Sequence, residues 1–135
     1  LRAMSRSVNG AFPIESAMQN SIVFYSDSEG DGLTERIRYF LDSGIIKRGV
    51  IHPSGSPLSY LGAEDISEKV HNVYLPAGNI LSYYDSNFSG IQSELTFPIS
   101  IPVISLIRIN VTVDPNPIDV SSRINFSSSV NIRNL

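Results

Sequence analysis

The sequence predicts an α+β fold, in which the end of an N-terminal helix packs on a single antiparallel sheet of about six or seven strands. Apolar residues at helical spacing open the chain, at Leu1, Met4 and Val8. From residue 21 onward, short runs of alternating apolar and polar residues, separated by turn sequences, indicate strands with one solvated face. We therefore expect residues 1–12 to be the C-terminal end of a helix and residues 13–135 to form a single β-rich head domain.

Length and composition are those of one globular domain. The 135 residues are 41% apolar and 17% charged, and they suffice to build a hydrophobic core. The formal charge of −3 provides no basic surface for a phosphate backbone, so we expect no nucleic-acid partner. The absence of cysteine excludes disulfides and thiolate metal sites. No apolar run approaches the roughly 18–20 residues needed to span a bilayer.

The first residues are typical of a helix that begins upstream of this chain. Gly10 would close it by adopting the left-handed conformation, and Pro13 prevents an early restart. The chain begins at Leu1 rather than at methionine. We expect a preceding segment, such as a signal sequence or a membrane anchor.

Three strands with short turns follow, at residues 21–27, 33–41 and 45–51, and they predict an antiparallel meander. The second of these strands has one apolar and one basic face. Its apolar face comprises Ile37, Tyr39 and Leu41, and its basic face comprises Arg36 and Arg38. The sequence DSG at residues 42–44 makes the turn to the third strand.

The rest of the chain predicts a loop, two short strands and a closing hairpin. Residues 53–69 form the loop, with one short helix near residues 64–69. Strands at residues 70–75 and 80–85 follow, and a long polar connection over residues 86–102 leads to the hairpin. The residues of this hairpin that we expect in the core are Ile107, Ile109, Val111, Val113, Ile124, Phe126, Val130 and Ile132.

Three strings of the sequence resemble the soluble domains of type IV pilin-like proteins, in particular minor pilins and J-type minor pseudopilins. NSIVFYSDSEGDGLTERIRYFLD at residues 20–42 is similar to the first hairpin of the family, which often contains an Asp-Gly-rich turn. ILSYYDSN at residues 80–87 resembles a strand with the ending YYD. SLIRINVTVD, together with the closing VNIRNL, resembles the last hairpin. The defining leader peptide and long apolar helix of the family are not in this sequence.

The resemblance implies a structural role without catalysis. The chain would be the soluble part of a minor subunit of a type IV pilus or of a type II secretion-like pseudopilus, contributing to filament assembly or to the filament tip. Its partners would be other pilin or pseudopilin subunits, and the inner membrane through the missing N-terminal helix. Its location would be extracytoplasmic, in the periplasm or at the cell surface. We expect the isolated domain to be a monomer, because the polymerising helix lies outside it.

The clearest candidate site is the sequence DSEGDG at residues 27–32. Asp27, Glu29 and Asp31 match the first three ligand positions of an EF-hand loop. Arg38 stands where that loop needs a bidentate glutamate, which excludes an EF-hand.

Two interpretations of this turn stay open. One is a calcium-binding β-turn, in which Asp27, Glu29, Asp31, Glu35 and the main-chain carbonyl of residue 33 are oxygen donors. The other is a plain hairpin turn, which the sequence favours, because Gly-Asp-Gly is turn chemistry in its own right. Calcium is therefore the one cofactor that the sequence leaves open.

No motif supports an enzyme. His52 and His71 are the two histidines, and we expect surface or packing roles for both. The sequence contains no nucleophile elbow, no dinucleotide-binding glycine motif and no P-loop. The alternative to a filament subunit is an extracellular β-rich binding module, an adhesin or carbohydrate-binding domain that recognises its ligand through loops such as residues 86–98. The segment before Leu1 would distinguish the two classes.

Overall fold

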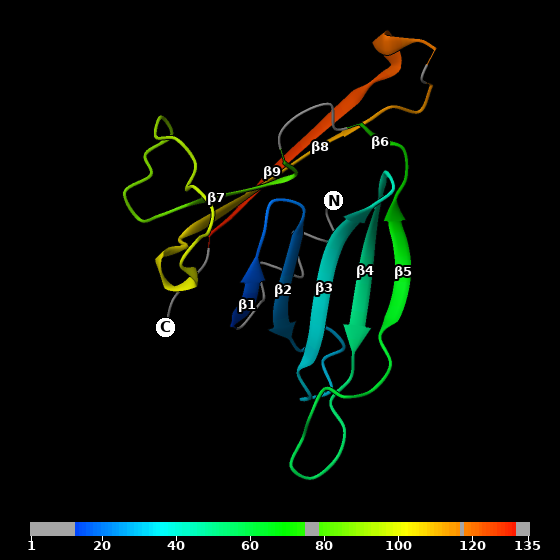
Figure 1. Cartoon of the computed structure of the whole chain (residues 1–135), viewed down its shortest axis with the longest axis vertical. Helices are drawn as coiled ribbons and strands as arrows, with labels where there is room; N and C mark the ends of the chain where they lie inside the picture. Colours follow the sequence, from blue (N-terminus) through cyan, green and yellow to red (C-terminus); the bar gives the residue numbers. More distant parts are fainter. Residues whose placement is uncertain (1–12, 75–78, 117, 132–135) are drawn as a thin grey trace.

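The computed structural model describes residues 13–74, 79–116 and 118–131, which form a β-sandwich of two antiparallel sheets (Figure 1). The first sheet contains five strands and the second contains four. The described residues include no α-helix, and two short 3-10 helices, η1 (Ile101–Val103) and η2 (Val120–Ser122), precede the last two strands. No helix in this part of the chain has the length and hydropathy of a membrane span.

The first sheet is a meander of consecutive strands, each paired with the next. The strands are β1 (Ile14–Ala17), β2 (Ser21–Ser26), β3 (Glu35–Asp42), β4 (Ile45–Ile51) and β5 (Asp65–Val70). The three strands of the predicted meander are confirmed as β2, β3 and β4. On β3, Ile37, Tyr39 and Leu41 face the other sheet, as predicted. Its two arginines face outward, and Phe40 lies on their side of the strand, beneath Arg38.

The second sheet is built around β8 (Leu106–Val113). Two short strands, β6 (Val73–Tyr74) and β7 (Leu81–Tyr84), share one edge of β8, and β9 (Ile124–Asn131) pairs along the other edge over the full length of β8. The predicted strand at residues 80–85 and the closing hairpin are confirmed.

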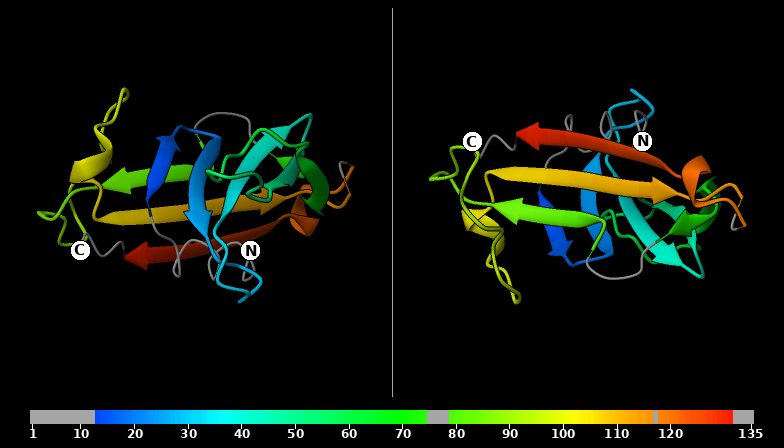
Figure 2. Two further views of the ribbon diagram at one scale, coloured as in Figure 1. Left: turned by 90° about the horizontal axis from the view of Figure 1, so that it is seen from below. Right: turned by 90° about the horizontal axis from the view of Figure 1, so that it is seen from above.

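The core lies between the two sheets, whose strands cross one another (Figure 2). Alternate residues of β2 and β3 meet alternate residues of β7 and β8, as expected for the inner faces of a sandwich. The buried residues of this core are Ala17, Ile22, Phe24, Ile37, Tyr39, Ile46, Ile80, Leu81, Tyr83, Ile104, Ile107, Ile109, Val111 and Val130.

The predicted α+β class with a single sheet is wrong. The strands divide into two sheets, and these sheets cover one another's apolar faces, so the described core needs no helix. The helix predicted for residues 1–12 lies outside the described residues. The short helix predicted near residues 64–69 is wrong as well, because this segment is strand β5 and pairs with β4 from Asp65 to Val70.

The closing hairpin is less buried than predicted. Val130 is buried, whereas Ile124 and Phe126 are 49% and 44% exposed. Their partners on β8 are better covered: Val111, opposite Phe126, is fully buried, and Val113, opposite Ile124, packs against the core. The exposure is therefore confined to β9, the outer strand of the hairpin. Ile132, also predicted in the core, lies outside the described residues.

Candidate functional site

The acidic sequence DSEGDG connects β2 to β3, and Asp27 organises this turn. The backbone N–H groups of Asp31 and Gly32 donate to the two carboxylate oxygens of Asp27 at 3.2 and 2.8 Å. Gly32 has a φ of +83°, a conformation that favours glycine. Desolvation raises the pKa of Asp27, whereas the hydrogen bonds from Gly32, Asp31 and Gly30 lower it. The combined effect of the hydrogen bonds is larger, so the pKa of Asp27 is below its usual value.

Glu35 is the first residue of β3, and its side chain is fully buried. It lies on the same face of the strand as Ile37, and its partner on β2 is Ser26. The Ser28 hydroxyl donates to Glu35 Oε1 at 3.3 Å. The other oxygen, Oε2, is buried and accepts no hydrogen bond. No ion pair among the described residues includes Glu35.

The predicted calcium ligands come together around this buried carboxylate. Carboxylate oxygens of Asp27, Asp31 and Glu35 all lie within 4.8 Å of one another. Glu29 belongs to a second group, in which its carboxylate, that of Glu35 and a ring nitrogen of His52 meet the same criterion. Glu35 is therefore common to an all-carboxylate group and to a mixed group.

Sequence analysis missed the partner of His52. This residue follows the end of β4, where Ile51 pairs with Arg36, and this register brings it beside the acidic turn. His52 Nε2 lies 2.8 Å from Glu29 Oε1, and this hydrogen bond, with the charges of Glu29, Glu35 and Asp31, raises the pKa of the His52 imidazole. His71 is exposed beside Glu68, in agreement with the surface role predicted for it.

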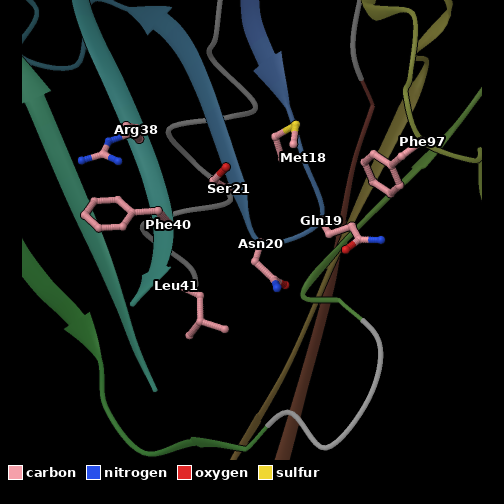
Figure 3. Close-up of a pocket in the computed structure, with 8 residues that line it drawn as sticks. All are labelled: Met18, Gln19, Asn20, Ser21, Arg38, Phe40, Leu41 and Phe97. Carbon is pink, nitrogen blue, oxygen red and sulfur yellow. The ribbon is translucent and has the colours of Figure 1, made fainter. Parts of the chain in front are cut away.

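A second feature is an open pocket of about 600 Å³ at the β1–β2 turn (Figure 3). Its lining residues are Met18, Gln19, Asn20, Ser21, Arg38, Phe40, Leu41 and Phe97. The one charged lining residue, Arg38, is held by Glu64 through two hydrogen bonds of 3.0 and 2.7 Å and lies over the Phe40 ring. The lining residues therefore provide no acid–base pair for catalysis.

A third feature is the β9 edge of the second sheet. This strand has eight residues, no charged residue, no proline and an unbroken register with β8. Exposed edges are usually protected by short strands, charges or bulges. In the first sheet, β1 is short and bulged, and β5 carries Asp65, Glu68 and Lys69. Residues 124–127 of β9 are exposed and have none of this protection.

In comparisons with protein-family models, with curated proteins and with solved structures, nothing matches this chain. The function therefore has to be inferred from the residues and their geometry.

Proposed function

We propose that this chain is the soluble domain of a minor subunit of a type IV pilus or of a type II secretion-like pseudopilus, and that it contacts neighbouring subunits through β9. The domain acts by assembly and catalyses no reaction. It works outside the cytoplasm, anchored to the inner membrane before assembly by a helix that precedes Leu1.

The observation that carries this proposal is the unprotected edge at residues 124–127. Apolar Ile124 and Phe126 remain 49% and 44% exposed on β9, although the β8 residue opposite Phe126, Val111, is fully buried. An uncharged strand with exposed apolar side chains favours contact with another protein, through backbone pairing, side-chain burial or both. The three strings that resemble pilin-like proteins identify the class of partner, namely other subunits of the same filament.

The fold does not support this proposal. A pilin-like domain would have a single sheet covered by a helix, whereas the described residues form two sheets. The sequence strings and the β9 edge are the remaining support.

The proposal is tested first by reading the coding sequence upstream of Leu1. We expect a short basic leader that ends in glycine, then an aromatic residue, a glutamate four residues later and about 20 apolar residues, enough to span a bilayer. A conventional cleaved signal peptide or another folded domain would instead favour the extracellular binding module.

The contact surface is tested by cysteine cross-linking in cells that produce the full-length protein. These 135 residues contain no cysteine, so a thiol introduced among them reports on one position of the domain. Ser127→Cys lies on the exposed part of β9, and Glu68→Cys on the charged edge β5 serves as the matched control. We expect a short bifunctional thiol–amine reagent to link S127C, but not E68C, to a subunit that mass spectrometry identifies as pilin-type. Equal cross-linking from both positions would contradict a role for β9.

A further inference from the structure

We propose that the β2–β3 turn binds a calcium ion, held by the carboxylates of Asp27, Asp31 and the buried Glu35. This proposal is independent of the filament role, because the β2–β3 turn belongs to the first sheet, whereas β9 belongs to the second.

The buried oxygen of Glu35 is the first argument. A carboxylate loses its hydration when it is buried, and this loss is costly unless a cation or hydrogen-bond donors compensate it. Glu35 Oε1 accepts one hydrogen bond, from Ser28, and Oε2 accepts none. A divalent cation between Glu35 and the turn would supply the missing partner.

The geometry of the turn is the second argument. One oxygen each of Asp27, Asp31 and Glu35 lies within 4.8 Å of the other two, so an ion placed among them would be at most about 2.8 Å from each. A small inward movement of the side chains would bring the oxygens to the roughly 2.3–2.6 Å of calcium ligands. The hydrogen bonds that Asp27 and Asp31 accept from the backbone fix the turn and leave further lone pairs on the carboxylates. Main-chain carbonyls and water would complete the six to eight oxygen ligands that calcium takes.

The choice of ion follows from the ligand atoms. A group of three carboxylates offers only oxygen ligands, which calcium prefers. Calcium also tolerates the irregular ligand arrangement of a turn, because its coordination geometry is flexible. The neighbouring group of Glu29, Glu35 and His52 offers one nitrogen and would suit zinc better. In that group, His52 and Glu29 already bind each other at 2.8 Å. The all-oxygen group is the one we assign.

Thermal unfolding of the 135-residue chain tests the site. The protein is freed of divalent ions and heated with no addition, with calcium chloride or with zinc chloride. We expect calcium to raise Tm by about 5–10 °C at a concentration about a hundredfold above its Kd. Isothermal titration should give a Kd on the order of 0.1–1 mM, the range of extracellular calcium modules.

Two substitutions and two controls make the test specific. Glu35→Gln keeps the shape of the side chain and removes the buried charge, so it should abolish the calcium-induced rise without lowering the Tm of the ion-free protein. Asp31→Asn changes an exposed ligand and should also abolish the rise, which keeps the test decisive if E35Q does not fold. Glu29→Gln removes one charge from the same turn and should retain most of the rise, as should His52→Gln.

Three outcomes would overturn the proposal. The first is that calcium at 10 mM, a concentration about tenfold above the highest Kd expected for such modules, leaves Tm unchanged. The second is that the calcium-induced rise in Tm persists in both E35Q and D31N. The third is that zinc but not calcium raises Tm and that H52Q removes this effect, which would assign the mixed group instead.

Discussion

At the scale of single residues, Gly49 leaves room for the carboxylate of Glu64, because glycine has no side chain. Gly49 on β4 pairs with Arg38 on β3, and the Glu64 carboxylate lies over Gly49 to bind Arg38 at 2.7 Å. A Cβ atom on Gly49 would lie 2.2 Å from Glu64 Oε2. The ion pair therefore depends on the absence of a side chain at residue 49.

Gly49→Ala should displace Glu64 and break its ion pair with Arg38. We expect a loss of about 1 kcal/mol in the free energy of unfolding, because the pair is partly buried and forms two hydrogen bonds. In a Glu64→Ala background, the same substitution should be neutral or stabilising, since alanine has a lower conformational entropy in the unfolded chain. Urea unfolding of the four proteins in this double-mutant cycle measures the coupling. Additive effects would show that Gly49 serves another purpose.

The residues of the acidic turn could be predicted from the sequence, but their environment could not. The spacing of Asp27, Glu29 and Asp31 identifies candidate oxygen donors, whereas their distances depend on how the turn closes. One signal was available: Glu35 is two residues before Ile37, so alternation directs it toward the core. The proximity of His52 depends on the register of β3 with β4, which alternation alone does not determine.

At the scale of elements, a cluster on the outer face joins the first three strands. Glu15 on β1 binds Arg36 on β3 at 2.6 Å and accepts a hydrogen bond from Tyr25 on β2. The hydrogen bonds from Arg36 and then Tyr25 lower the pKa of Glu15 below its usual value of 4.5. The short edge strand β1 is thereby attached to the rest of the sheet.

This lowered pKa makes stability depend on pH in the acidic range. A carboxyl whose pKa is lower in the folded state stabilises the protein above its unfolded pKa, and this contribution is lost as pH falls through the folded pKa. Between about pH 5 and pH 3, Tm of the wild type should therefore fall more steeply than Tm of Glu15→Gln. Solvent screening keeps the difference small, because Glu15 is 40% exposed. Glu94→Gln, at an exposed residue without an ion pair among the described residues, should keep the wild-type slope.

Elements with a clear local pattern were predicted well, and elements defined by pairing were not. Strands β3 and β8 alternate apolar and polar residues, and β2 and β4 are rich in β-branched residues between turns, so their positions follow from the sequence. The sequence DISEKV of β5 is charged and mostly exposed, so its local pattern does not distinguish a helix from a strand. Its pairing with β4 decides the outcome, as tertiary context often does for weak propensities.

At the scale of the whole molecule, the number of sheets was the main error. Alternation identifies which face of a strand is apolar, but the same pattern fits one sheet under a helix or two sheets face to face. Here residues 71–72, between β5 and β6, move the chain from the first sheet to the second, and the second sheet then covers the first. The polar sequence around this crossing gives no periodic signal for that change of layer.

Tyr83 links the two layers, and its hydroxyl gives a test of the sandwich. This residue of β7 is fully buried, and its hydroxyl donates to the Met18 carbonyl oxygen at the β1–β2 turn at 2.8 Å. Burial raises the pKa of the hydroxyl, which stays protonated as the donor. Tyr83→Phe should leave that carbonyl without its partner and lower the free energy of unfolding by about 1–2 kcal/mol, or Tm by roughly 4–8 °C.

The neighbouring tyrosine is the matched control for this link between the sheets. Tyr84 is also buried, and among the described residues its contacts are made by its ring, with Phe88 and Arg108. Tyr84→Phe keeps that ring and should change Tm little. Equal destabilisation by Y83F and Y84F, measured by calorimetry, would contradict the specific bond to Met18. A larger effect of Y83F would show that one hydrogen bond between the layers contributes to the stability of the whole domain, because the sheets unfold as a cooperative unit.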